Sequence, residues 1–483
     1  MRTLFRLLPF LACPVALLWT VQHDPFFWDS VQLASRHAHH FYENGLRWTT
    51  LPPVIDSGHP PVFGLYLAAV WTLFGKTLPV SHWAMLPFLL AIVLLLYRLG
   101  RRLGGDQWAF WLLPLVLLDP VLAGQMALVS PDVALAGFFL LAVEATLGQK
   151  RWLLTLAILG LCAISMRGMM TAGVLFVWQL TMRIGEYGTW NFLNRGTPIP
   201  HSAFRISYSA FLPGFAFAAG FLWWHQRATG WTGYHPASSW APAFAPAQGL
   251  ALLKNALVIG WRWLDFGRVF EWLVFGYLIW KFWRRKTLAS STQWQVPGIA
   301  LVVLLILTWL FLSPSAVLYH NLSAHRYFLA GFITFHLLVF QWITQSDWHN
   351  RVKAWLFAGL TVAMATGNCW IYPQGISMDW DSTLAHQPYH QLRAEALVFL
   401  EKEKIDFQTV GSLFPNLSSG EHLQLNGDPR RLAELDWQRN TYIFASNVFN
   451  DLSSADYARL RQHWDLLYRR AHAGVWIEIY RRR

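Results

Sequence analysis

Residues 80–102 of the chain read VSHWAMLPFLLAIVLLLYRLGRR, an apolar stretch that ends in three closely spaced arginines, Arg98, Arg101 and Arg102. The apolar core of a bilayer is about 30 Å thick, and a helix of roughly 20 mostly apolar residues crosses it. Arginine and lysine concentrate on the cytoplasmic side of such helices. The stretch therefore predicts a membrane-spanning helix whose C-terminal end faces the cytoplasm.

The composition of the whole chain favours many such helices. Of 483 residues, 55% are hydrophobic and 13% are charged, against roughly 25% charged residues in a soluble domain. The 29 tryptophans are expected where amphipathic rings gather at membrane interfaces. These values exclude an ordinary soluble enzyme. The formal net charge of +12 lies in short clusters between apolar stretches, so it requires no nucleic-acid partner.

Eleven stretches have the apolar character expected of membrane-spanning helices. The predicted fold class is therefore a polytopic α-helical membrane protein. The first stretch follows Arg2 and Arg6 and lacks a small-residue cleavage site, which favours a retained anchor over a signal peptide. The predicted spans lie near residues 7–22, 80–97, 108–123, 131–148, 152–166, 168–183, 206–224, 265–283, 296–312, 327–343 and 354–372.

One further apolar stretch, Val62 to Phe74, is short for a span. If it crossed the membrane, the arginines after Tyr97 would face outward, against the positive-inside rule. We therefore expect a juxtamembrane helix within an outer loop of residues 23–79. The N-terminus is then cytoplasmic and the C-terminus is periplasmic or extracellular, as in a multi-pass protein of a bacterial inner membrane. The basic residues placed inside are Arg98, Arg101, Arg102, Lys150, Arg151, Arg183, Arg195, Lys281, Arg284, Arg285, Lys286, Arg351 and Lys353.

The composition changes after Tyr372, where ordinary polar spacing begins. Residues 1–372 are predicted to form the transmembrane domain, and residues 373–483 a small extracytoplasmic α/β domain. Within the second domain the pattern predicts helices over residues 391–403 and from Ser453, with Asp456 three residues on, and strands over residues 441–445 and 475–480.

Two acidic residues, Asp29 and Asp132, lie just beyond predicted spans on the outer side. Each has a simple structural explanation. Asp29 precedes the helical pattern from Val31 to Tyr42 and is suited to cap it, and Asp132 opens the fourth span, where the helix dipole favours a carboxylate. The functional alternative is that one carboxylate acts as a general base and the other orients it or the acceptor.

Basic and aromatic residues are predicted at the same depth on the same side. Arg167 lies between two spans, and His325-Arg326-Tyr327 begins another. Both arginines are able to snorkel into the interface without any further role. Alternatively, together they are suited to hold a phosphate that gains charge as a bond to it breaks.

The outer loop is rich in histidine, with His37, His39, His40 and His59. Histidines three residues apart share a helical face, which leaves a divalent metal open as an alternative to plain interfacial histidines. No acidic ligand has a fixed spacing to them, so no metal ligand is assigned.

These residues, in this order and on these sides, resemble the GT-C superfamily of membrane glycosyltransferases. The branch concerned contains the protein O-mannosyltransferases and the bacterial lipid A aminoarabinose transferase, and the match in layout covers roughly the first 340 residues. Its components are Asp29, His59-Pro60-Pro61, Leu73-Phe74-Gly75, Asp132, Arg167-Gly168 and Arg326-Tyr327. Asp29 is followed by serine where the family often has glutamate, and His59 stands where many members have lysine.

The resemblance implies an inverting glycosyltransferase of the hexosyl or pentosyl class. It would move a sugar from a polyprenyl-phosphate donor to a hydroxyl of a glycan, lipid or protein acceptor. Membrane lipids would surround the protein. Asp29 and Asp132 would be catalytic. The donor phosphate would lie against His59, Arg167 and Arg326, and His325 and Tyr327 are candidate substrate contacts.

Two other functions remain open from the sequence. One is transport or flipping of lipid-linked sugars, and the other is a non-catalytic scaffold or sensor. Transporters usually carry polar residues near the midplane of broken helices. The predicted spans have few ionisable residues, which favours the enzyme.

Overall fold

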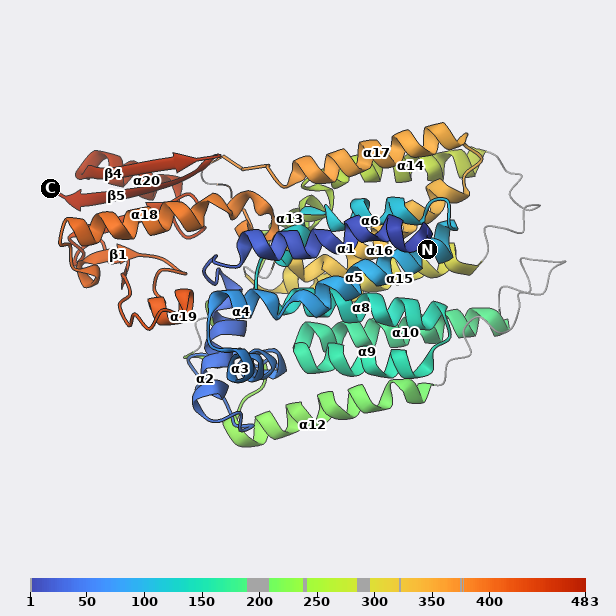
Figure 1. Cartoon of the computed structure of the whole chain (residues 1–483), viewed down its shortest axis with the longest axis horizontal. Coiled ribbons are helices and arrows are strands. Elements are labelled where there is room, and N and C mark those ends of the chain that lie inside the picture. Colours follow the sequence, from blue (N-terminus) through green and yellow to red (C-terminus); the bar gives the residue numbers. More distant parts are fainter. Residues whose placement is uncertain are drawn as a thin grey trace.

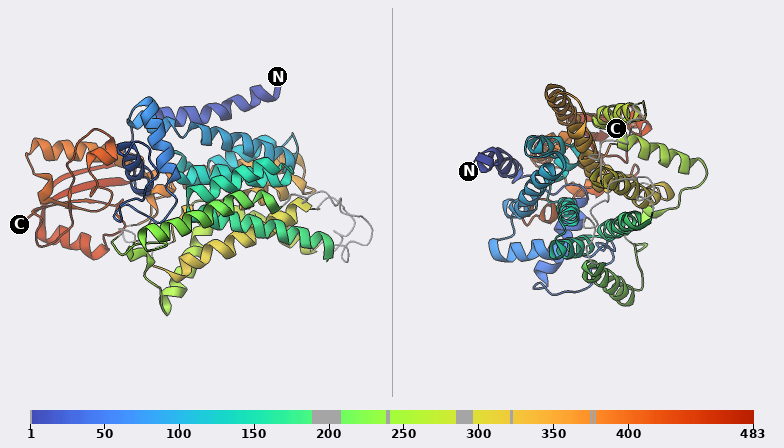
Figure 2. Two further views of the ribbon diagram at one scale, coloured as in Figure 1. Left: turned by 90° about the horizontal axis from the view of Figure 1, so that it is seen from below. Right: turned by 90° about the vertical axis from the view of Figure 1, so that its right-hand side faces the viewer.

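The computed structural model describes residues 2–188, 208–237, 241–284, 296–320, 323–373, 376 and 378–483. Long apolar helices lie side by side in an elongated bundle, and a smaller part with a β-sheet lies at one end of it (Figures 1 and 2). The bundle helices are α1 (Arg2–Val21), α5 (Leu86–Gly104), α8 (Pro131–Leu147), α9 (Arg151–Ile164), α10 (Met166–Gly188), α12 (Leu212–Thr229), α14 (Arg268–Arg284), α15 (Val296–Leu318), α16 (Leu329–Gln345) and α17 (Asn350–Gly367).

These helices follow the predicted stretches closely, but they do not establish the number of crossings. Among the described residues, three helical stretches are long and apolar enough to cross a membrane: Leu78–Gly104, Gly298–Leu318 and His325–Gln345. A bent pair of helices would make a fourth. The count of eleven therefore stays a prediction.

The predicted span 108–123 is not one helix. It is divided into α6 (Ala109–Leu117) and α7 (Pro120–Met126), which are bent by 72°. The cause is local, because Pro120 disfavours helical backbone in the residue before it. Asp119 then caps α7, and its Oδ1 accepts the Val121 and Leu122 N–H groups at 3.0 and 3.2 Å.

A second difference concerns the segment of residues 225–264, between the predicted spans 206–224 and 265–283. It contains a helix, α13 (Leu250–Leu264), preceded by Gly249 with a φ of +55°. The sequence pattern does not predict this helix, because its apolar stretch is shorter than the roughly 20 residues expected of a span.

The first outer loop forms short helices at the end of the bundle next to the sheet (Figure 1). They are the π-helical segment η1 (Val31–Arg36), α2 (His37–Glu43), α3 (Val62–Phe74) and α4 (Leu78–Trp83). Helix α3 runs across the bundle axis (Figure 1), which suits the juxtamembrane position expected for it.

The connections α5–α6, α8–α9 and α16–α17 lie at the opposite end of the bundle (Figure 1). Basic residues predicted to face the cytoplasm gather there, and Arg98 pairs with the buried Glu144 at 2.7 Å. Arg195, Arg285 and Lys286 lie outside the described residues. The two ends are thus chemically distinct, while their assignment to membrane sides stays a prediction.

The smaller part contains a five-stranded sheet in the order β2-β1-β3-β5-β4. Strands β2, β1 and β3 are mutually parallel, and β3, β5 and β4 are antiparallel. Both predicted strands and both predicted helices are present, as β3, β5, α18 and α20. The elements are α18 (Pro388–Lys402), β1 (Val410–Ser412), α19 (Gly420–Gln424), β2 (Ala433–Glu434), β3 (Tyr442–Ser446), α20 (Ser454–His463), β4 (Trp464–His472) and β5 (Val475–Arg482).

The sheet part is joined to the bundle through a shared hydrophobic core. Phe27, Leu128 and Phe266 from the first 372 residues belong to the same buried cluster as Trp380 and Tyr389. Phe27 also stacks on the His386 ring, with centroids 4.9 Å apart. This packing places the short turn η5 (Trp380–Ser382) against the end of the bundle.

Candidate active site

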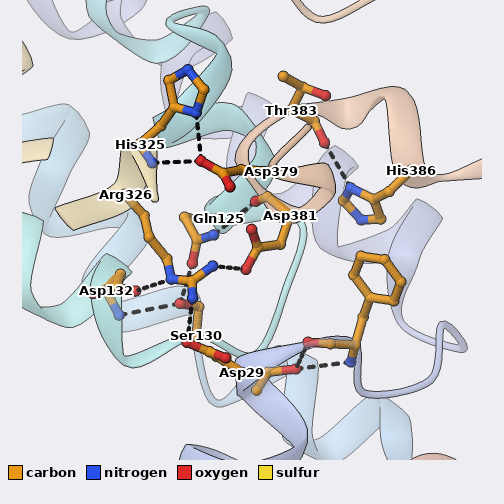
Figure 3. A network of polar contacts seen from close by, with 12 residues as sticks. Asp29, Gln125, Ser130, Asp132, His325, Arg326, Asp379, Asp381, Thr383 and His386 are labelled. Carbon is orange, nitrogen blue, oxygen red and sulfur yellow. Dashed lines mark hydrogen bonds and ion pairs between the residues drawn. The ribbon is translucent and has the colours of Figure 1, made fainter. Parts of the chain in front are cut away.

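The Arg326 guanidinium lies at the centre of a cluster of carboxylates at the junction of the bundle and the sheet part (Figure 3). Its Nη1 donates to Asp381 and its Nη2 to Asp29. Its Nε is 3.6 Å from Oδ2 of Asp132. Arg326 belongs to the short helix η4 (His325–Phe328), which leads into α16.

The three carboxylates come from distant parts of the chain. Asp29 lies in the turn after α1, beside Trp28 with its left-handed φ of +47°. Asp132 lies in the first turn of α8, and Asp381 lies on η5. Gln125 Nε2 donates to the Asp381 carbonyl oxygen at 2.7 Å, which anchors η5 to the bundle.

The second arginine, Arg167, completes the cluster. Its Nη1 is 2.9 Å from Oδ1 of Asp132, and its guanidinium lies 4.3 Å from the centre of the Tyr327 ring. The close approach of α10 to α9 positions it, because a Cβ on Gly168 would lie 1.9 Å from the Leu161 carbonyl oxygen. Asp132 thus bridges two cations, and Tyr327 offers its ring to one of them.

Two small cavities adjoin this cluster, and both are lined by Asp132, Leu135 and Arg167. One is also lined by Arg326 and Tyr327, and the other by His59. Their volumes of about 30 and 10 Å³ are far below those of ligand pockets, so a ligand larger than water enters only if the surrounding side chains move.

His59 lies close to this cluster, but its charge differs from that of a lysine. Its Nδ1 accepts the Met166 N–H at 3.3 Å. Burial, together with smaller contributions from the charges of Arg167 and His37, lowers its pKa to about 3. His59 is therefore neutral near pH 7, and its Nε2–H is a hydrogen-bond donor without a permanent positive charge.

His325 is fully enclosed and is held between two carboxylates. Its Nδ1 is 2.7 Å from Oδ2 of Asp379, and its Nε2 is 2.9 Å from Oδ2 of Asp265. Each ring nitrogen of His325 thus has a carboxylate as its partner. His325 lines neither cavity. Its contacts instead fix the start of η4, and with it the position of Arg326.

The ionisation of the site carboxylates is strongly perturbed. Burial raises the pKa of Asp29, and the opposing charges of Arg326 and Arg167 only partly offset this. Burial also raises the pKa of Asp381 to about 7. Burial acts in the same direction on Asp379, but Arg262 and His325 outweigh it and lower the pKa below its ordinary value. A raised pKa makes a carboxylate a stronger base.

The capping explanation is wrong for Asp29. Ser30 is at the N-cap of η1, with no side-chain cap bond, and the Asp29 carboxylate pairs with Arg326. At α8 the cap is Ser130, whose Oγ accepts the Asp132 N–H at 3.2 Å. The Asp132 side chain, although in the first turn, is directed to Arg167 and Arg326.

The loop histidines have separate partners. His37 bonds to the Ile55 carbonyl, His39 to the Ser35 carbonyl and His40 to Thr49, and His59 to the Met166 N–H. In the part of the chain that the structure describes, no three His, Cys, Asp or Glu side chains are grouped for a metal. The four histidines do not form a common ligand set.

Asp381, Asp379 and Asp265 were not among the predicted site residues. The sequence could have indicated the segment Asp379-Trp380-Asp381, because it places two carboxylates shortly after the last predicted span. The sequence places this segment in a soluble domain, where acidic residues are normally solvated. In the structure it packs near Phe27 and Gln125, and this packing positions Asp381 beside Arg326.

No protein-family model and no curated protein sequence matches the chain. Two crystal structures of ArnT from Cupriavidus metallidurans match it over nearly its whole length. The structure bound to undecaprenyl phosphate has a TM-score of 0.54 at 12% identity, covering 98% of this chain and 97% of that one. The structure in the apo state has a TM-score of 0.53 at 12% identity, covering 99% and 98%. The chain has the ArnT fold.

The match to ArnT confirms the fold that the GT-C resemblance implied. It also extends past the first 340 residues, because the coverage includes the sheet part. At 12% identity, the likeness to ArnT concerns the fold, and the activity has to be argued from the site residues of this chain.

Proposed function

We propose that the protein is a membrane glycosyltransferase that moves a sugar from a polyprenyl-phosphate donor to an acceptor hydroxyl, with inversion at the anomeric carbon. The observation that supports this most directly is the pairing of Arg326 with Asp29 beside Arg167 and Asp132, at cavities with apolar walls. Two guanidinium groups and a buried carboxylate are the parts such a reaction needs, namely a phosphate clamp and a base.

The donor phosphate would bind to Arg167 and Arg326. Guanidinium groups match the geometry of phosphate oxygens and stabilise the charge that develops as the glycosidic bond breaks. His59, which is neutral and lines the same region, would contribute its Nε2–H. The cavity lined by Leu135 and Phe139 has a volume of about 30 Å³, and it would have to widen to accommodate the beginning of the polyprenyl chain.

Asp29 would act as the base. Its carboxylate would accept the proton of the acceptor hydroxyl while that oxygen forms a bond to the anomeric carbon. The bond from this carbon to the phosphate oxygen breaks at the same time, and its electron pair leaves with the phosphate. Attack from the face opposite the phosphate inverts the configuration. Asp132, held by Arg167 and close to Arg326, would keep both cations oriented toward the phosphate.

A direct assay tests this proposal. The purified full-length protein, reconstituted in lipid nanodiscs, is incubated with radiolabelled polyprenyl-phosphate sugars and a panel of glycan, lipid and peptide acceptors. We expect transfer of label to one acceptor class, with product of inverted configuration by NMR. Release of sugar only to water, or a retained configuration, contradicts the proposal.

One observation favours the alternative of a transporter. The sequence predicts spans with few ionisable residues. The structure instead has a buried cluster of ionisable side chains beside the break between α6 and α7. Asp119 pairs with Arg268 at 2.6 Å and with His336 at 3.1 Å, and His336 pairs with Glu271 at 2.9 Å. Charges at a broken helix are typical of transporters. Passage of a labelled polyprenyl-phosphate sugar across liposomes without acceptor would support this function.

A further inference from the structure

Three carboxylates surround the Arg326 guanidinium, and two of them accept hydrogen bonds from it. Asp381 takes Nη1, Asp29 takes Nη2, and Asp132 lies beside Nε. A phosphate bound to any N–H group of Arg326 therefore lies close to the negative charge of these carboxylates. The arrangement therefore requires one carboxylate to lose its charge when an anionic ligand binds.

Charge balance leads to the same requirement. The cluster contains three carboxylates, Asp29, Asp132 and Asp381, against two guanidinium groups, Arg167 and Arg326. The side chains of Asp29 and Asp381 are only 13% and 6% exposed. A donor phosphodiester adds one further negative charge, and uncompensated charge in such an enclosed site is costly.

The three carboxylates differ in how firmly they are held. Asp132 is bound by Arg167 at 2.9 Å and lies at the positive end of α8. Asp29 is the base in the proposed reaction and has to stay beside the substrate. Asp381 lies on a three-residue turn beyond the last bundle helix, and its carboxylate is held by Arg326. Of the three, Asp381 is the one whose charge can be lost without disturbing the proposed base or the Asp132–Arg167 pair.

We propose that Asp381 gates donor binding: its carboxylate pairs with Arg326 and has to take up a proton before the donor phosphate binds there. This inference rests on the proposed function. In this proposal Asp381 is a positioning residue that controls access to Arg326. The chain that carries Asp381 leads into α18 and the sheet, so the sheet part is connected directly to the phosphate site.

The surroundings of Asp381 suit protonation near neutral pH. Burial raises its pKa to about 7, Arg326 opposes this, and Asp29, Asp379 and Asp132 add to it. These are the charged groups that face it, from η4, from the turn after α1, from its own segment and from α8. With a pKa of about 7, the protonated fraction falls about tenfold from pH 6 to pH 8, and the apparent affinity for the phosphate should fall with it.

Binding of undecaprenyl methyl phosphate to the full-length protein in nanodiscs tests this gate. The probe is a phosphodiester with a single charge over the whole pH range, so only the protein titrates. For the wild type we expect the Kd to be about tenfold higher at pH 8 than at pH 6. For Asp381→Asn we expect the Kd at pH 8 to stay near the wild-type value at pH 6.

Asp24→Asn is the matched control. Burial raises the pKa of Asp24 to about 7 as well, and this residue lies in the same turn region as Asp29, but its charge is directed toward Gln387. We expect the Asp24→Asn protein to keep the wild-type pH dependence. The thermal unfolding temperature of each variant shows that it is folded.

The outcomes separate the gate from the proposed function. A wild-type Kd that does not change with pH, or a pH dependence that persists in Asp381→Asn, overturns the gate while donor binding stands. If the wild type does not bind the phosphodiester at either pH, both the gate and the proposed function are wrong. If Asp381→Asn does not fold, the wild-type pH profile alone still decides against the gate when it is flat.

Discussion

Asp29 and Arg326 are 297 residues apart in the chain and form an ion pair. The pair joins the turn after the first helix to the start of α16. Arg326 extends the connection to Asp381, in the part of the chain that leads to the sheet. The base and the phosphate clamp of the proposed reaction are therefore in direct contact, and each is expected to influence the other.

Replacing the base tests its role. We expect Asp29→Asn to lower the rate of sugar transfer by about 10²- to 10⁴-fold, the usual contribution of a positioned general base. Donor binding should persist, because Asn retains the size of Asp and leaves both arginines in place. Single-turnover transfer and donor binding are measured on the same preparation. Full activity of Asp29→Asn would show that another group is the base.

Removing one arginine tests the clamp. A hydrogen bond between charged groups contributes about 1.5–3 kcal/mol, so Arg167→Met should raise the Kd for undecaprenyl methyl phosphate by roughly 10- to 100-fold. Titration of the probe in nanodiscs measures this. Arg101→Met, which removes an exposed arginine paired with Asp106, serves as the control, with a Kd close to that of the wild type. An unchanged Kd in Arg167→Met contradicts the assignment.

The packing of the sheet part should weaken in acid. Burial lowers the pKa of His386 to about 4, from an ordinary value of 6.5. The unfolded chain therefore binds the proton more readily than the folded protein, so stability is fully present above pH 6.5 and is lost as the pH falls toward 4. The effect is of the order of 2–3 kcal/mol.

Thermal unfolding measured from pH 8 to pH 4.5 checks this. We expect the unfolding temperature to fall in acid and to fall less steeply in His386→Gln, which cannot take up the proton. Stacking of His386 on Phe27 ties the loss to the contact between the two parts. An equal slope in the two proteins would mean that other groups cause the acid sensitivity.

The buried ion pairs at the α6–α7 break should matter for stability. Arg268→Met leaves Asp119 and Glu271 with His336 as their only remaining cation among the described partners. Breaking a buried pair of this kind costs about 3–5 kcal/mol, so we expect a large fall in the unfolding temperature in detergent. Arg101→Met, which breaks the exposed pair with Asp106, should change it little. Similar effects in both variants would contradict the structural role.

Periodicity and composition predicted the local elements well. Residues 80–102 lie within the apolar helical stretch Leu78–Gly104, which comprises α4 and α5. Ser453 with Asp456 opens α20 with a reciprocal capping box. These features depend on neighbouring residues, which a linear pattern contains. The division of residues 108–123 at Pro120 was equally local, and the leucine-rich pattern on both sides concealed it.

The sequence by itself determined the helical class of the chain, the polar C-terminal part and the set of charged residues from which the site is built. Those properties follow from hydropathy and from the scarcity of ionisable groups. Only the tertiary structure decided the partners of these groups. In the structure, His325 fixes the start of η4 through its carboxylate partners, His59 is buried and neutral, and Asp381 pairs with Arg326. Ion pairing and burial are set by distances between segments far apart in the chain, and no local pattern specifies those distances.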